Sequence, residues 1–140
     1  MLVRDVESIW TNIKCVLTDI LTGIKMKTKD AERRSEEFLS KRFRRDYNSV
    51  RLNSHNTLDH ELAKTKLSYF LIRNGNKILT EVVFDNGSRA DILDLSNMVV
   101  YEILHSEKIE EALKKREYYP EVFEIVNLTS KEVLEEDFEW

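Results

Sequence analysis

Two acidic residues on neighbouring predicted strands form the pattern of this chain that bears most directly on chemistry. Asp91 follows Arg-Ala in one apolar segment, and Glu102 follows Val-Tyr in the next. If Leu95 pairs with Met98 across a two-residue turn, the two acids face each other with Cβ atoms about 4.5–5.5 Å apart. Like charges at that distance repel unless a cation lies between them, and Mg²⁺ and Mn²⁺ prefer oxygen ligands. The pair therefore predicts a metal site; the alternative is a structural pair neutralised by Arg89 or by a lysine.

The strand faces that carry the two acids are otherwise apolar. Because side chains alternate along a strand, Asp91 shares a face with Leu93, and Glu102 shares the matching face with Val100 and Leu104. A face of this kind packs against a helix, and burying two unpaired carboxylates there costs several kcal/mol. This cost favours a functional reason for the pair.

Hydrophobic periodicity and turn signals predict the elements that position the pair. The predicted elements are a helix at 58–74, strands at 77–84, 89–95 and 98–105, a helix at 107–118, a strand at 121–127, and a short acidic helix starting at Thr129 or Ser130. The core is therefore an α/β fold of order α-β-β-β-α-β. Asn56 or Thr57 can cap the first core helix, and Gly75 suits the position after its end.

The first core helix has a wide apolar surface that predicts packing against a sheet. One stripe is formed by Leu58, Leu62, Tyr69 and Ile72. Leu67, Phe70 and Leu71 widen it.

The residues before the core are expected to form a helical extension. Apolar residues recur at helical spacing over 2–22, a second helix is predicted at 29–46, and residues 47–56 are rich in turn formers and indicate a linker. We therefore expect an N-terminal helical extension over 1–55 and an α/β core over 56–140.

Residues 25–51 are strongly basic, with ten Lys or Arg against five Asp or Glu, although the whole chain has a net charge of −4. Such a segment can bind the phosphates of a nucleic acid. The candidate phosphate contacts are Lys41, Arg42, Arg44 and Arg45. The alternative is a solvated helix face.

Composition excludes several other classes of protein. No apolar run approaches a membrane span, so we expect no membrane association. The single cysteine, Cys15, is expected to be a buried core thiol. Because one cysteine cannot form an internal disulfide, we expect an intracellular, cytoplasmic protein. The three histidines lack the spacing of a zinc site, and the isolated glycines exclude a P-loop and a nucleotide cofactor.

The order and spacing of the core motifs resemble those of a known family. The relevant stretches are His60-Glu61-Leu62-Ala63-Lys64, Gly75, Glu81, Gly87-Ser88-Arg89-Ala90-Asp91-Ile92-Leu93 and Val100-Tyr101-Glu102-Ile103-Leu104-His105-Ser106. Over residues 57–128 the chain resembles the PD-(D/E)XK nuclease superfamily, in its RecB-like and Holliday-junction-resolvase-like branches. The resemblance implies a restriction-endonuclease-like core with a mixed sheet flanked by helices. It also implies that Asp91, Glu102 and the backbone carbonyl of Ile103 bind the metal, and that Glu61 is the acid supplied by the first core helix.

The family's motif lysine is replaced by Leu104, which cannot orient water or stabilise negative charge. Lys64 lies one turn after Glu61 and can take its place, with Lys108, Lys114 and Lys115 as further candidates. The Lys114-to-Tyr118 spacing resembles a Lys/Gln-x-x-x-Tyr pattern of the family, in which this helix contacts DNA or completes the site. Lys114 and Lys115 are accordingly expected to bind nucleic acid.

Three further residues have open assignments. A two-residue turn at Asn86-Gly87 makes Glu81 face away from Asp91, whereas a three-residue loop with a bulge brings Glu81 beside Asp91 as a third metal carboxylate. His60 is expected to be exposed or packed against the linker. His105 is a candidate substrate contact.

Together these features predict a nuclease that uses Mg²⁺ or Mn²⁺ to hydrolyse phosphodiester bonds of DNA, with double-stranded DNA as the expected partner. The alternative is a catalytically inactive nucleic-acid-binding module of the same fold. A third interpretation makes the N-terminal helices an arm that forms a homodimer.

Overall fold

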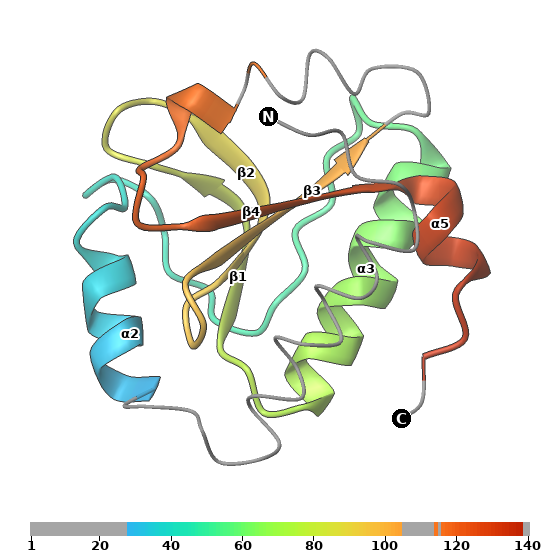
Figure 1. The fold of residues 1–140 in the computed structure, drawn as a ribbon. Coiled ribbons are helices and arrows are strands. Elements are labelled where there is room, and N and C mark those ends of the chain that lie inside the picture. Colours follow the sequence, from blue (N-terminus) through green and yellow to red (C-terminus); the bar gives the residue numbers. More distant parts are fainter. Residues whose placement is uncertain (1–27, 105–113, 115, 139–140) are drawn as a thin grey trace.

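A mixed four-stranded sheet forms the centre of the protein. The computed structural model describes residues 28–104, residue 114 and residues 116–138 (Figure 1). The elements are α2 (Thr28–Glu36), α3 (Leu58–Arg73), β1 (Ile78–Val83), β2 (Arg89–Asp94), β3 (Val99–Leu104), a 3-10 turn (Arg116–Tyr118), β4 (Glu124–Thr129) and α5 (Ser130–Glu135). The strand order is β1-β2-β3-β4, with β1, β2 and β3 antiparallel and β4 parallel to β3. The predicted α/β class is thus confirmed.

Two predicted helices fall where the structure gives little or no description. The helix at 2–22 lies outside the described residues. Of the helix at 107–118, only Lys114 and the final 3-10 turn are described. None of the helices described is long and apolar enough to span a membrane.

The sheet is covered on both faces, which makes two apolar layers. Helices α3 and α5 cover one face and α2 lies on the other (Figure 1). The α3 side is packed with residues such as Leu67, Leu71 and Ile92. The α2 side is packed with residues such as Leu39, Leu93 and Phe123. Apolar side chains are thus buried on both faces of the sheet.

The ends of α3 follow the local signals in the sequence. The Thr57 side chain accepts a hydrogen bond from the His60 N–H at 3.2 Å, as a helix N-cap does. Gly75 has φ +85°, and its N–H donates to the carbonyl of Ile72 at 2.9 Å. Both predicted ends are confirmed, because capping depends only on neighbouring residues.

The face that α3 turns toward the sheet differs from the predicted stripe. Leu58, Leu62 and Tyr69 are exposed. The buried residues of the helix instead include His60, Glu61, Ala63, Lys64, Leu67, Phe70 and Leu71. The apolar pattern therefore predicted part of the buried face, Leu67, Phe70 and Leu71, and missed its polar members. Those polar residues have partners in the sheet and the preceding loop.

The hairpin of β2 and β3 has the predicted alignment. Ile92 pairs with Tyr101 and Asp94 with Val99, so Asp91 lies level with Glu102.

The hairpin of β1 and β2 has the longer of the two loops considered. The Phe84 N–H donates to the Ser88 carbonyl at 2.9 Å, which closes a three-residue loop. The Asn86 side chain accepts from the Ser88 N–H at 3.0 Å, and Gly87 has φ +87°. The two-residue turn is therefore wrong, and Glu81 lies across from Asp91, between the pairs formed by Thr80 and Val82.

The segment before α3 packs along β1 and contradicts two sequence predictions. The helix predicted at 29–46 ends at Glu36, because Leu39 forms a β-bridge with Phe84 and the Ser40 N–H donates to the Val83 carbonyl. The expected linker at 47–56 is also held in place: the Arg51 N–H donates to the Thr80 hydroxyl at 2.8 Å. These contacts protect the exposed edge of β1 from pairing with other chains.

Candidate functional site

Asp91 and Glu102 lie on neighbouring strands, and each carboxylate accepts a backbone N–H from the facing strand. The Asp91 N–H donates to Glu102 Oε1 at 3.2 Å, and the Ile103 N–H donates to Asp91 Oδ2 at 2.8 Å. Glu102 is buried, with 6 % of its surface exposed. At this point of the hairpin, carboxylate oxygens thus accept backbone N–H groups in place of the carbonyl oxygens of a regular β-ladder.

His60 connects α3 to this carboxylate pair. Its Nε2 lies 3.3 Å from Asp91 Oδ2, and its Nδ1 lies 3.1 Å from Glu61 Oε1. Only 8 % of its surface is exposed. The expectation of an exposed histidine, or one packed on the linker, is therefore wrong, because the inner face of α3 points His60 at β2.

Lys64 is fully buried between two glutamates. Its Nζ lies 2.7 Å from Glu61 Oε2 and 2.7 Å from Glu81 Oε1, and none of its surface is exposed. One carboxylate comes from the same helix and the other from β1. The structure thus brings the three residues Glu61, Lys64 and Glu81 together beneath α3.

Glu61 is held by the loop before its own helix as well as by Lys64. Its oxygens accept the Asn53 N–H at 3.0 Å and the Asn56 side-chain amide at 2.8 Å. Burial alone would raise the pKa of Glu61, but the hydrogen bond to Lys64, followed by those to Asn56, Asn53 and His60, lowers its pKa to about 2. The carboxylate is therefore ionised throughout the neutral range.

The two carboxylates around His60 favour its protonated form. Burial lowers the pKa of His60, but the hydrogen bond and charge of Asp91, and then those of Glu61, outweigh it and raise the pKa above 6.5.

Tyr119 reaches the site from the segment before β4. Its hydroxyl lies 2.7 Å from Glu102 Oε1 and 2.7 Å from the Arg89 carbonyl, and the side chain is buried. Burial, followed by the negative charge of Glu102, raises the pKa of Tyr119 well above its ordinary value, so the hydroxyl remains a donor. Tyr118, the tyrosine of the resemblance, is exposed instead.

Negative charge exceeds positive charge among the described residues around α3. Glu61, Glu81 and Asp91 supply three carboxylates, and Lys64 and His60 are their cationic partners. The net charge of these five side chains is −1 when His60 is protonated and −2 when His60 is neutral. Such an excess in a largely buried place favours a further cation.

The side chains are nevertheless not arranged as a ready-made ligand set. In the described part of the chain, no three His, Cys, Asp or Glu residues are placed so that they could hold a metal ion together. Asp91 Oδ2 already accepts the Ile103 N–H and contacts His60. An ion at Asp91 would have to share this carboxylate or displace His60 from it.

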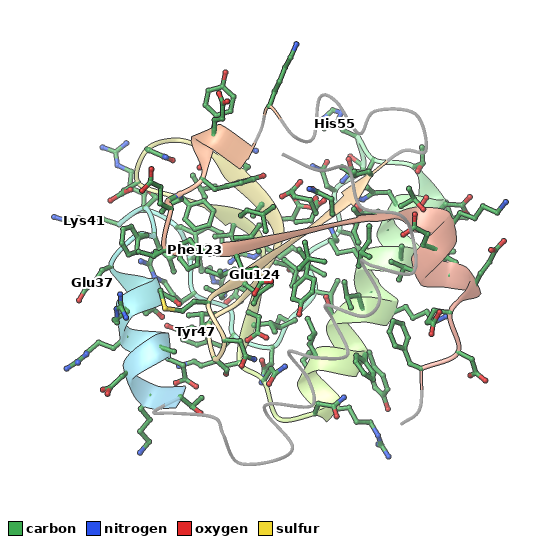
Figure 2. The ribbon with its side chains drawn as sticks, in the orientation of Figure 1. Glu37, Lys41, Tyr47, His55, Phe123 and Glu124 are labelled. Atoms are coloured by element: carbon green, nitrogen blue, oxygen red, sulfur yellow. The ribbon has the colours of Figure 1, made fainter. Side chains whose placement is uncertain are left out.

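The basic residues proposed as nucleic-acid contacts have different environments. Lys41 and Arg42 are exposed, and Figure 2 shows Lys41 pointing into solvent beside α2. Arg44 is exposed and forms an ion pair with Asp46 at 3.0 Å. Lys114 is also exposed, whereas Lys108, Lys115 and His105 lie outside the described residues.

Arg45 has a structural role that the sequence did not indicate. It is half-buried, donates to the Ser40 and Phe43 carbonyls, and pairs with Glu36 at 3.3 Å. Its donors satisfy carbonyl groups where α2 does not continue. These contacts occupy donors of Arg45 within the chain, and its predicted contact with phosphate stays a prediction.

Sequence reasoning did not assign His60 and Tyr119 to the site. A signal for His60 was present, because its spacing to Lys64, Leu67 and Leu71 places all four on one helix face. Tyr119 carried no comparable signal, since it stands next to Tyr118 in an irregular segment. Comparisons with protein-family models, with curated proteins and with solved structures found no match to this chain.

Proposed function

We propose that this protein is a metal-dependent nuclease that hydrolyses phosphodiester bonds of DNA, with its active site around Asp91 and Glu102. The restriction-endonuclease-like topology is part of the proposal. It is supported by the order of α3, β1, β2, β3 and β4 and by the parallel pairing of β4 with β3.

One observation carries the proposal: a buried lysine and several carboxylates meet where α3 crosses β1 and β2. Lys64 lies between Glu61 and Glu81. Asp91 lies opposite Glu81 on the neighbouring strand and contacts His60. Burying so many ionised groups is costly and is found more often at functional sites than in structural cores.

The donors around Asp91 fit a hard divalent cation. Asp91 and Glu102 offer carboxylate oxygens on adjacent strands, and the excess of negative charge at Glu61, Glu81 and Asp91 would be offset by the ion. Asp91 and Glu102 would hold Mg²⁺ or Mn²⁺, and His60 would give up its contact with Asp91 to the ion. Such a cation supplies Lewis acidity and activates water near neutral pH.

Lys64 would replace the motif lysine, whose position in the sequence is occupied by Leu104. A buried ammonium held by two carboxylates is a fixed positive charge, which can stabilise negative charge that develops on a phosphate. Tyr119 would orient the Glu102 carboxylate through its 2.7 Å contact. The exposed Lys41, Arg42, Arg44 and Lys114 would bind phosphates of double-stranded DNA, which would make binding weaken with salt.

Cleavage of supercoiled plasmid tests the proposal. We expect nicking or linearisation with Mn²⁺ or Mg²⁺, none with EDTA, and a loss of at least about 100-fold in Asp91→Asn and in Glu102→Gln. The matched controls are Asp85→Asn, in the β1–β2 loop, and Glu124→Gln, at the start of β4. Both replace exposed carboxylates and should cleave like the wild type.

Salt-sensitive DNA binding without divalent-dependent cleavage would overturn the nuclease assignment and favour the inactive nucleic-acid-binding module. Cleavage that survives in both Asp91→Asn and Glu102→Gln would place the active site elsewhere. Size-exclusion chromatography with light scattering on the same samples would identify a homodimer.

A further inference from the structure

Glu81 has an unusual backbone conformation in the middle of a strand. Its φ is +50°, in the left-handed region that residues other than glycine rarely adopt. The strand pairing continues on both sides, with Thr80 opposite Ile92 and Val82 opposite Ala90. A strained residue inside an otherwise regular hairpin persists only when its surroundings hold it there.

The strain at Glu81 changes which way β1 presents its side chains. Leu79 and Val82 both pack on the α2 side of the sheet, although three residues apart they should face opposite sides. Ala90 and Leu93 on β2 also both pack there, so the alternation slips by one residue in both strands, at the level of Glu81 and Asp91. The slip accompanies a contact in which Glu81 Oε1 lies 2.7 Å from Lys64 Nζ on α3, on the other side of the sheet.

Glu61 and Glu81 hold Lys64 in different ways. Glu61 lies one helical turn from Lys64 and is independently fixed by Asn53 and Asn56. Glu81 comes from another element, and the side-chain contact it makes among the described residues is with Lys64. The carboxylate of Glu81 thus holds the lysine against β1, beside the strand that carries Asp91.

We infer that Glu81 is a positioning residue for Lys64 and not a metal ligand. The inference rests on the proposed function, in which Lys64 stabilises the charge of the reacting phosphate. The left-handed conformation at Glu81 places its carboxylate on the lysine, and Glu81 acts on the reaction through that lysine.

Kinetic non-additivity between Glu81 and Lys64 is the decisive measurement. In Glu81→Gln we expect kcat for DNA cleavage to fall by at least about tenfold, with KM for DNA within about twofold of wild type. Lys64→Gln should fall further, and the double variant should lie within about twofold of Lys64→Gln, because Glu81 acts through Lys64. If the losses of kcat in the two single variants multiply in the double variant, the inference is overturned.

Binding of Mn²⁺ to the full chain, measured by titration calorimetry, provides a readout independent of turnover. If Glu81 positions Lys64, the Kd for Mn²⁺ in Glu81→Gln should stay within about threefold of wild type, whereas loss of a carboxylate ligand should weaken it by about tenfold or more. Weakening of that size would restore Glu81 as a ligand and overturn the inference.

The Glu81→Gly variant separates the effect of the side chain from that of the backbone strain, because glycine adopts φ +50° without strain. This variant should fold and should lose as much kcat as Glu81→Gln. Full activity in Glu81→Gly would overturn the inference and leave the proposed nuclease standing. Absence of cleavage and of Mn²⁺ binding in the wild type would instead overturn the proposed function, and the positioning role of Glu81 with it.

Discussion

The imidazole of His60 lies between two carboxylates, with Nε2 3.3 Å from Asp91 Oδ2 and Nδ1 3.1 Å from Glu61 Oε1. Both ring nitrogens can donate only when the ring is protonated. The same contact links the predicted metal carboxylate of β2 to the acid of α3. The free energy of unfolding should therefore respond to the protonation of His60.

Replacement of His60 by glutamine should remove a stabilising contribution that depends on pH. Because the folded-state pKa is raised above 6.5, the contribution is fully present below pH 6.5 and is lost as pH rises through the folded pKa. Urea unfolding of wild type and His60→Gln should thus differ most near pH 5.5 and less near pH 9. His55→Gln is the matched control, since His55 is exposed. A difference that grows with pH would contradict the assigned protonation.

Glu61 should govern stability at acid pH. Its folded pKa of about 2 lies below the ordinary value of 4.5, so its contribution is present above pH 4.5 and is lost as pH falls toward 2. The shift corresponds to an upper limit of about 3 kcal/mol. Glu61→Gln should be destabilised at pH 7 and should approach the wild type near pH 2.5 in urea unfolding. A constant difference across this range would show that the shape of the side chain matters and its charge does not.

The alignment of Asp91 with Glu102 could be predicted because it depends on a short turn. Once Leu95 and Met98 flank that turn, the register of both strands follows from the period of two. The position of Glu81 could be predicted only as one of two alternatives. The loop length is decided by the Asn86 side chain bonding to Ser88, and the dipeptide Asn86-Gly87 is compatible with both lengths.

The contacts of His60 and Tyr119 depend on how distant elements pack, so they were beyond local signals. His60 meets Asp91, 31 residues later, only because α3 packs on β2 with His60 on its inward face. Tyr119 meets Glu102 because the segment before β4 returns beside β3. Apolar periodicity predicted only part of the inner face of α3, since it assigns polar residues to solvent and does not count their buried partners.

Removal of the Tyr119 hydroxyl should disturb Glu102 without disturbing the apolar packing. The ring would keep its edge-to-face contact with Phe84, whose centroid lies 5.9 Å away. We expect Tyr119→Phe to lower the free energy of unfolding by about 1–3 kcal/mol, because a buried carboxylate loses a donor. Tyr118→Phe, at an exposed site, should change it by less than about 0.5 kcal/mol. Equal stability of the two variants would show that the Tyr119 contact contributes little.

Replacement of Lys64 by methionine should be strongly destabilising at neutral pH. The change retains most of the side-chain volume but leaves Glu61 and Glu81 facing each other without the ammonium. We expect a loss of about 3–5 kcal/mol, as for breaking other buried ion pairs. The control Lys131→Met lies on the exposed surface of α5 and should change stability by less than about 0.5 kcal/mol. Urea unfolding at pH 7 measures both, and a small loss in Lys64→Met would mean that one glutamate becomes protonated at little cost.

Divalent cations should stabilise the folded protein through Asp91 and Glu102. A ligand that binds only the folded state at about 100 times its Kd adds about 2.7 kcal/mol to the free energy of unfolding. For a domain of this size the melting temperature should rise on the order of 10 °C.

Thermal unfolding with Mn²⁺, Mg²⁺ or EDTA tests this without any nucleic acid. Asp91→Asn and Glu102→Gln should lose the rise, while Glu124→Gln, which removes an exposed carboxylate from β4, should keep it. An equal rise in all four proteins would mean that the cation binds elsewhere on this acidic chain.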